Sequence, residues 1–483
     1  MITFVALSNG CLLGPEYSEP PVQVEDTWVY HNNPHLRTEP PVDPVWWENA
    51  FSDPTLNDLV AFALQENLTL RAAALRTIQA QQQLAIAIGN QFPQSQQLTG
   101  LASRSRNAGV ILEEYNVGFN LSWELDMWGR FRRQVEYAAA ELSARAADYD
   151  GVLVSLVAQV AQTYILIRTT QARLSVAHRN IGLQEESLRI AQAKFQSGAV
   201  SGLDVAQAKT LLNNTKATVP DLESTLQQLK NTLATLLGVP PLTIGHLDGQ
   251  EGKIPSPPAH VAIGMPQNLL RQRPDIRSSE RRLAAQAAQI GIARTDLYPA
   301  LSIGGSIGSQ ATSLGNLFEG ESETWELLGG FQWNLFNYGR LRSNVRLQDA
   351  RFQELLEQYR QTVIDAQTDA ENAIVTYLKS FDRLTFLRRA ARASRESVRL
   401  STTQYTNGQI DFNTVITTLT ADTQQQDILV QIQGAVAVNL VQVFLSLGGG
   451  WQVRADTTPD NLLPDPVKKE MHERTKYWKE IFR

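Results

Sequence analysis

Cys11 is the single cysteine of this chain, and its thiol is the side chain best suited to a covalent modification. It stands in the stretch LSNGCLLGPEY, after a short apolar run and a glycine. This setting is typical of the acylation site of a bacterial lipoprotein and predicts a residual signal segment at residues 1–10. No Lys or Arg precedes Cys11, and Ser8 occupies a position that usually holds Leu or Val. An unmodified cysteine near the N-terminus is the alternative.

Sequence patterns for catalysis, cofactor binding or metal binding are absent from the chain. It contains no phosphate-binding P-loop, no GxGxxG and no HExxH pattern. The histidines lack the spacing of metal ligands on one helix or strand, and stand at 31, 35, 178, 246, 260 and 472. We therefore predict that the protein is not an enzyme and that it holds no cofactor and no metal.

Charge and hydropathy exclude two broad classes of protein. With 43 Lys and Arg against 49 Asp and Glu, the net charge of −6 offers no basic footprint for a nucleic acid. The mean hydropathy of −0.23 is too low for a bundle of membrane helices. The most apolar long run, residues 151–167, is interrupted by Gln159 and Gln162, so it falls short of a lipid-facing helix.

Residues 115–125 alternate between apolar and polar side chains, as in a strand with two different faces. The odd positions hold Tyr115, Val117, Phe119, Leu121, Trp123 and Leu125. The even positions hold Asn116, Gly118, Asn120, Ser122 and Glu124. The odd face must contact either a protein core or lipid, whereas the even face suits water.

The chain is an internal duplication. WELDMWGRFR at 123–132 matches WNLFNYGRLR at 333–342, and FQSGAVSGLDV at 195–205 matches YTNGQIDFNTV at 405–415, both 210 residues further along. The steps Phe92-Pro93 and Tyr298-Pro299 are 206 residues apart, so one loop differs in length by four residues. Several anchors with one spacing indicate two structural repeats, which we place at 54–238 and 273–448.

Each repeat is expected to contain a helix, two strands, a very long helix, a glycine turn and a return helix. Asp53 and Pro54 open the first helix, which is expected to run to about Asn90. The strands are expected at about 92–104, 114–126, 298–310 and 324–336. The long helices are expected at about 130–196 and 340–406, and the return helices at 203–237 and 412–447.

Both long helices carry an apolar residue at every seventh position. These are Leu153, Val160, Ile167, Leu174, Ile181, Leu188 and Phe195, and then Val363, Ala370, Tyr377, Leu384, Ala391, Val398 and Tyr405. A helix with this repeat supercoils against a neighbour. At 1.5 Å per residue, a helix of 67 residues is about 100 Å long, too long for a compact domain.

The four strands are predicted to contact lipid through their apolar face, and a soluble sandwich is the alternative. An open sheet in lipid leaves backbone groups unpaired at its edges, so closure requires several copies. Two chains give eight strands with a filled interior, whereas three give twelve strands with a lumen. The residues expected to face lipid are Tyr115, Val117, Phe119, Leu121, Trp123, Trp325, Phe331 and Trp333.

The sequence resembles the bacterial outer-membrane factor family, of the TolC and OprM type. The resemblance covers nearly the whole chain and is carried by CLLGPEYSEP, by LLRQRPDIRSSERRL at 269–283, by FxxG…DV at 195–205 and by YxxG at 405–408. Its N-terminal stretch and RPDIR are similar to the drug-efflux lipoprotein branch. Leu12 in place of Asp after Cys11 fits sorting to the outer membrane.

The resemblance implies an α+β membrane channel. Its homotrimer would form a 12-stranded transmembrane β-barrel, four strands per chain, continuous with a periplasmic α-helical barrel. An equatorial collar would come from residues 11–53, 239–272 and 449–483. The family implies a passive exit duct of a tripartite efflux pump, with outer-membrane lipid, a periplasmic adaptor protein and an inner-membrane pump as partners. A type I secretion channel and, in a different class, a soluble coiled-coil scaffold are the alternatives.

The resemblance also implies a closed periplasmic entrance at the glycine turns of Gly198 and Gly408. The family's inter-hairpin Asp falls on Asp204 and its Tyr partner on Tyr405. The Arg that completes this link in some relatives falls on Ile410. Relatives carry ring carboxylates where this chain has Thr414 and Thr417, and a ring Leu where it has Asn413. We thus expect an uncharged entrance; alternatively, Asp204 is a first-turn acid and Asp411 a helix N-cap.

Overall fold

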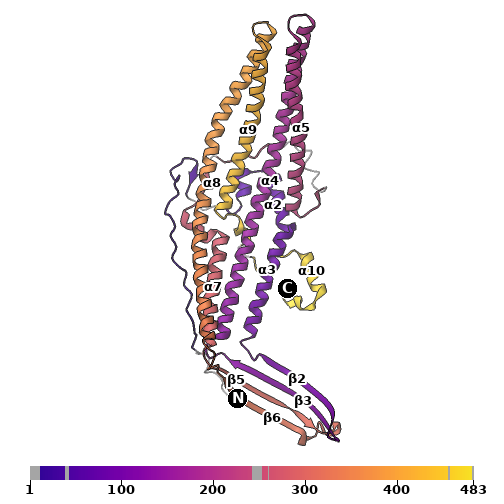
Figure 1. Cartoon of the computed structure of the whole chain (residues 1–483), viewed down its shortest axis with the longest axis vertical. Coiled ribbons are helices and arrows are strands. Elements are labelled where there is room, and N and C mark those ends of the chain that lie inside the picture. The colour runs from indigo at the N-terminus through magenta and orange to yellow at the C-terminus, as the bar shows by residue number, and fades with distance from the viewer. Residues whose placement is uncertain (1–10, 39–42, 242–252, 259, 455–456, 481–483) are drawn as a thin grey trace. The chain divides into compact units, whose positions relative to one another are not determined.

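The computed structural model describes residues 11–38, 43–241, 253–258, 260–454 and 457–480 (Figure 1). The expected signal segment at 1–10 and the centre of the linker, 242–252, lie outside the described residues. Two compact units are present. The first comprises Met1–Val22, Leu75–Asp148 and Arg277–Thr362, and the second Gln23–Ala74, Tyr149–Ile276 and Val363–Arg483. Each unit therefore combines parts of both sequence repeats.

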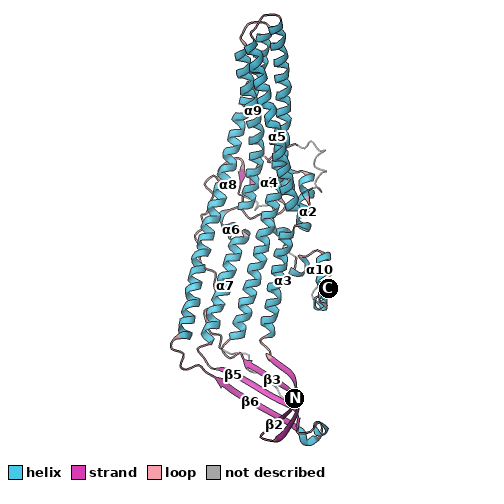
Figure 2. Ribbon diagram, turned by 45° about the vertical axis from the view of Figure 1, so that its right-hand side comes forward, coloured by secondary structure: helices cyan, strands magenta, loops and turns pink. Residues whose placement is uncertain are grey.

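Most of the described chain is helical (Figure 2). The α-helices are α1 Trp46–Phe51, α2 Pro54–Glu66, α3 Leu68–Gly89, α4 Arg130–Gln196, α5 Gly202–Leu237, α6 Leu269–Gln272, α7 Pro274–Thr295, α8 Arg340–Thr406, α9 Phe412–Ser446 and α10 Asp465–Arg474. The strands are β1 Leu36–Arg37, β2 Ser95–Asn107, β3 Val110–Leu125, β4 Val261–Ala262, β5 Ala300–Ala311 and β6 Glu323–Gln332.

The first unit contains an antiparallel sheet in the order β2-β3-β5-β6 (Figure 1). Paired residues lie on one face of a sheet. One cross-strand row is Leu98, Phe119, Ile307 and Trp325, and the next row, on the other face, is Gln97, Asn120, Ser306 and Glu326. The register thus confirms the apolar and polar faces, and it adds Leu98 of β2 to the apolar face.

The strand boundaries differ from the sequence prediction. β2 begins at Ser95 and β3 already at Val110, so the first hairpin lies further along the chain than expected. β6 ends at Gln332, which leaves Trp333 beyond the strand, where its indole nitrogen donates to the carbonyl of Leu297 at 3.0 Å. Because β2 carries few apolar residues, the alternation could not define its ends.

The first predicted helix is two helices. Asp53 caps α2 by accepting hydrogen bonds from the amides of Thr55 and Leu56, as the sequence indicated. The chain then breaks at Asn67, whose side-chain oxygen accepts from the Leu70 amide at 2.8 Å and whose amide donates to the Leu236 carbonyl at 2.8 Å. A new N-cap tied to α5 therefore replaces the expected continuous helix.

The long helices α4 and α8 are continuous over 67 residues each, which confirms the prediction. The seven-residue positions of α8, from Val363 to Tyr405, are all buried. In α4 only Leu153, Val160 and Ile167 of the corresponding set are buried, and Phe195 is 50% exposed. The prediction of a helix–helix contact was therefore wrong for Phe195.

Two described helices, α4 and α9, each contain an 18-residue window long and apolar enough to cross a membrane. Of these windows, 67% and 50% is buried inside the protein. Core helices have the same length and composition, so the packing of the helices against one another accounts for their apolar character.

The second unit gathers segments from the N-terminal part, the linker and the C-terminal part of the chain. β1 pairs in parallel with β4 through Leu36 and Val261. The buried indole of Trp46 stacks on Phe444 with ring centroids 4.9 Å apart and donates to the Gly449 carbonyl at 3.3 Å. These contacts hold together three segments that are distant in sequence.

Close backbone approach in the sheet predicts an intolerant glycine. A β-carbon on Gly308 would meet the carbonyl oxygen of Val117 and, at 2.6 Å, the Cα of Gly118. We expect Gly308→Ala to destabilise the sheet by about 1–3 kcal/mol, the range of overpacking changes. Gly329→Ala is the matched control, because nothing lies within 4 Å of its added carbon. Thermal unfolding followed by the sheet's circular dichroism, with equal midpoints for both variants, would contradict this.

Candidate functional site: the tips of the two helical hairpins

The second unit contains two helical hairpins, α4–α5 and α8–α9, and each ends in a glycine turn (Figure 2). Gly198 and Gly408 have φ of 73° and 75°, a left-handed conformation that glycine adopts without penalty. In both turns the glycine amide donates to the carbonyl three residues earlier, to Phe195 and Tyr405, at 3.0 Å. The turns therefore repeat each other, as the duplication predicts.

An apolar cluster lies behind the turns and includes residues from both hairpins. Its buried members are Ala191, Ala208, Val398, Tyr405, Phe412, Val415 and Leu419. The ring of Tyr405 lies 5.1 Å from that of Phe412, centroid to centroid. The aromatic pair anchors the end of α8 to the start of α9.

Tyr405 joins the two hairpins by polar contacts as well. Its hydroxyl donates to Oδ2 of Asp204 over 3.5 Å, a long hydrogen bond. Lys194 Nζ donates to the backbone carbonyl of Tyr405 at 2.6 Å and lies 4.5 Å from the centroid of its ring. The structure thus brings the two residues of the expected link together, and it places a cation beside them.

Sequence reasoning missed Lys194. It belongs to the last turn of α4, and its ammonium group satisfies a carbonyl in the last turn of α8. A cation is favourable at a helix C-terminus, where carbonyl groups lack partners. The position of Lys194 in the last turn was a visible signal, but its partner, 211 residues away, was not.

The phenol of Tyr405 is held in its neutral form. Burial, reinforced by the negative charge of Asp204 and the hydrogen bond to it, raises the pKa of Tyr405 to about 12. The neutral phenol donates to Asp204, whereas a phenolate would repel it. This contribution to stability is complete below pH 10 and is lost as the pH rises through about 12.

Asn413, Thr414 and Thr417 lie exposed on the first turns of α9. Thr414 and Thr417, three positions apart, share one helix face. Their hydroxyls donate within the helix, that of Thr414 to Asp411 Oδ1 at 3.0 Å and that of Thr417 to the Asn413 carbonyl at 2.8 Å. Each hydroxyl keeps an oxygen that can accept, so this face is polar and uncharged.

The carboxylates near the turns have structural partners. Asp411 is the N-cap of α9 and accepts from the Thr414 amide at 3.0 Å, which confirms the alternative interpretation of this residue. Asp204 lies in the first turn of α5, where an acid is also favourable. Asp422 is buried and accepts from Ser394 at 2.6 Å, so it does not reach the exposed face of α9.

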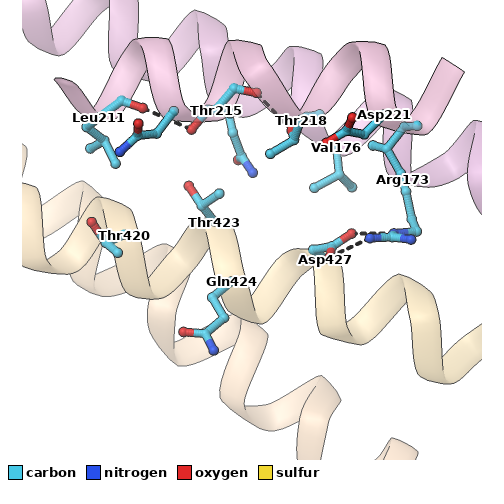
Figure 3. A pocket seen from close by; sticks show the side chains of 14 residues that line it. Arg173, Val176, Leu211, Thr215, Thr218, Asp221, Thr420, Thr423, Gln424 and Asp427 are labelled. Carbon is cyan, nitrogen blue, oxygen red and sulfur yellow. Dashed lines mark hydrogen bonds and ion pairs between the residues drawn. The ribbon is translucent and has the colours of Figure 1, made fainter. Parts of the chain in front are cut away.

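A cavity of about 470 Å³ separates the hairpins further from the turns (Figure 3). It lies between α4, α5 and α9, and most of its lining is polar: Arg173, Asn180, Asn214, Thr215, Thr218, Asp221, Thr420, Thr423, Gln424 and Asp427. At one end Arg173 forms a bidentate ion pair with Asp427, at 2.7 and 3.1 Å. This part of the contact between the hairpins is therefore polar and accessible to water.

Cys11 is exposed and lies next to the sheet of the first unit. Leu13 donates its amide to the Trp128 carbonyl at 3.2 Å, and Leu12 packs against Gly129. The guanidinium of Arg133 donates to the Leu13 carbonyl at 3.0 Å. The segment that follows Cys11 is thus fixed where β3 leads into α4.

The residues expected to face lipid differ in exposure in the single chain. Trp325 and Phe331 on the edge strand β6 are 75% and 72% exposed, whereas Phe119 on β3 is 40% exposed. Tyr115, Val117, Leu121 and Trp123 are half-buried by their neighbours in the sheet. The register places these residues, apart from Trp333 beyond the strand end, on the apolar face.

Comparison with known proteins relates the whole chain to outer-membrane proteins. The family model "Outer membrane efflux protein" matches residues 59–239 and 265–449. The pyoverdine export outer membrane protein OpmQ of Pseudomonas putida is 31% identical over 86% of this chain and 90% of its own length. The probable outer membrane lipoprotein SilC of Salmonella typhimurium is 26% identical over 93% of this chain and 98% of its own.

A solved structure shows the same fold. The outer-membrane channel OprN superposes with a TM-score of 0.87 at 31% identity, covering 92% of this chain and all of that one. The similarity therefore includes both the sheet and the long helical hairpins.

The raised pKa of Tyr405 can be measured by difference titration. We expect Tyr405→Phe to remove phenolate absorbance that appears in the wild type only as the pH approaches 12, because burial and Asp204 oppose ionisation. Tyr477→Phe is the control, since this 76% exposed phenol should ionise near pH 10, its ordinary value. A loss near pH 10 in both variants would show that Asp204 and burial do not act on Tyr405.

Proposed function

The chain belongs to the outer membrane efflux protein family, and we propose that it is the passive outer-membrane exit duct of a tripartite efflux pump. In this proposal it receives small molecules from an inner-membrane pump through a periplasmic adaptor protein. The relatives' names support an export role: OpmQ is named for pyoverdine export and CusC of Escherichia coli for cation efflux. The energy for transport comes from the partners.

The observation that carries the proposal is the sheet with one apolar face, one polar face and two unpaired edges. Apolar residues such as Phe119 and Trp325 share one face, and Asn120 and Gln97 share the other. In lipid, the backbone groups of β2 and β6 need partners. We propose that three copies close into a 12-stranded barrel whose polar face lines a lumen.

The helical hairpins then form the periplasmic part of the duct, and their tips form its entrance. We propose that the Tyr405–Asp204 hydrogen bond holds the two hairpins of one chain together in the closed state, with Lys194 as a third member. Thr414 and Thr417, with Asn413 beside them, line the narrowest part. Because Ile410 replaces the Arg of some relatives and the bond is 3.5 Å long, this closure is weak.

The remaining parts of the chain have supporting roles in this proposal. Residues 11–53, 239–272 and 449–483 form a collar around the two repeats at 54–238 and 273–448. Acylated Cys11 anchors the chain at the membrane surface, supported by the contacts of Leu12 and Leu13 with the end of the sheet. A single acyl chain binds membranes only marginally, so the barrel supplies most of the attachment.

The lipid-facing assignment is tested by a pair of neighbouring substitutions. We expect Phe119→Arg to impair assembly in the outer membrane, because arginine on the lipid face costs about 2–4 kcal/mol near the bilayer midplane. Asn120→Arg, on the opposite face of the same strand, should assemble like the wild type. Recovery of folded protein from outer membranes measures both, and equal recovery would refute the proposed duct.

The closure is tested by conductance in planar bilayers. We expect the double variant Tyr405→Phe with Asp204→Ala to conduct more than the wild type, because each copy loses a hydrogen bond to a charged group. Such bonds contribute about 1.5–3 kcal/mol, and the length of this one favours the lower value. Tyr377→Phe is the control, a buried tyrosine of the same helix away from the tips. Unchanged conductance in the double variant would exclude Asp204 and Tyr405 from the closure.

A further inference from the structure

The two strand hairpins of the sheet have the same register. In the first hairpin Ser95 pairs with Ser122, and in the second Ala300 pairs with Gln332. The second pair follows from the first by moving 205 residues along from β2 to β5 and 210 along from β3 to β6. Every pair of the second hairpin obeys this rule, so the strands of the repeats are equivalent residue by residue.

Side-chain contacts at the base of the sheet repeat in the same way. The Trp123 indole donates to the Gln91 carbonyl at 3.3 Å, and the Trp333 indole donates to the Leu297 carbonyl at 3.0 Å. These two contacts are equivalent within the duplication, 210 and 206 residues apart. The equivalence therefore extends from the backbone to the side chains that flank the strands.

A third contact occurs in only one of the two possible places. Trp128 lies with its ring centroid 4.9 Å from that of Tyr298 and donates to the Pro299 carbonyl at 2.7 Å. This contact joins the end of β3 to the start of β5, across the boundary between the repeats. The equivalent residues are Tyr338, after β6, and Phe92-Pro93, before β2.

Tyr338 and Phe92 are exposed in the single chain. Tyr338 is 103% exposed and Phe92 62%, while Trp128 is half-buried by its contact. Tyr338 also has a φ of 50°, a strained value for an aromatic residue that Trp128 does not share. These residues flank the two outer strands, so no position within one sheet lets them meet as their equivalents do.

We propose that β6 of one copy pairs antiparallel with β2 of the next in the register that the internal repeat specifies, and that Tyr338 then packs on Phe92-Pro93 of the neighbouring copy. The occupant of each open edge is thus a second copy of this chain. The inference rests on the proposed ring of copies and adds to it the residues that meet.

The register follows from the β3–β5 pairing inside the chain. Leu121 pairs with Gly305, and the rule converts this pair to Phe331 opposite Gly100 of the next copy. In the same way, Asn116 with Gln310 becomes Glu326 opposite Ser105, and Tyr115 with Ala311 becomes Trp325 opposite Arg106.

Two physical features favour this register. It keeps Phe331, Trp325 and their neighbours in line with the apolar face of β2, whereas a slip of one residue would place them in line with its polar face. It also sets the guanidinium of Arg106 beside the Trp325 ring, a favourable cation–π pair. Arg106 and Trp325 lie near the ends of their strands, where a charge has access to water.

Disulfide formation between copies tests the register. Ser105→Cys with Glu326→Cys should give reductant-sensitive covalent dimers and trimers from detergent-solubilised protein on oxidation. The two edges of one sheet are about 14 Å apart at 4.7–4.9 Å per strand, so the bond cannot close within a chain. The matched control, Ser103→Cys with Glu326→Cys, is displaced by two residues and should give little product. The single variants report any reaction with Cys11.

A second pair tests the aromatic contact. Phe92→Cys with Tyr338→Cys should also link copies, whereas Phe92→Cys with Trp128→Cys should not, because Trp128 is occupied within its own chain. Product from the displaced strand pair instead of the designed one would overturn the register.

The mass of the solubilised wild-type particle separates the two levels of the proposal. A trimer in which neither designed pair links copies overturns the edge pairing and leaves the duct intact. A particle that stays monomeric refutes the duct itself, and with it the inference.

Discussion

The constraint on which the proposed duct depends is the hydrogen bonding of two strand edges. The sheet β2-β3-β5-β6 satisfies its inner strands and leaves one side of β2 and one side of β6 unpaired. Water can satisfy these groups, but lipid cannot. An apolar face and open edges on one sheet are therefore compatible only if other copies complete it. The duplication explains how one contact geometry can serve inside the chain and again between copies.

The helical hairpins follow a different principle. Within α8–α9 the seven-residue positions are apolar and buried, so each hairpin member is held firmly to the other. Between the hairpins the contacts are largely polar: Tyr405 with Asp204, Lys194 with a carbonyl, and Arg173 with Asp427 across a hydrated cavity. Polar contacts exchange readily with water, at a small net cost. Rigid hairpins joined by such contacts can move apart without unfolding.

The sequence predicted the parts of the fold that depend on local pattern and repetition. The boundaries of α4 and α8, both glycine turns and the two faces of the sheet follow from periodicity, from the spacing of 210 residues and from glycine's backbone freedom. The break at Asn67 depends on the Leu236 carbonyl, and the role of Lys194 depends on that of Tyr405. Partners so distant in sequence leave no local pattern, so these features required the structure.

The duplication also explains why the two halves of the tip are unequal. Asp204 and Tyr405 form the polar link within the chain, but their repeat equivalents, 210 residues away, are Thr414 and Phe195. If copies form a ring, each hairpin has one neighbour in its own chain and one in the next. The polar link then exists at only one of these two contacts, and the other joins an exposed phenylalanine to a threonine. Such an arrangement makes the contact between copies the weaker one at the tip, because it lacks both the carboxylate and the phenol.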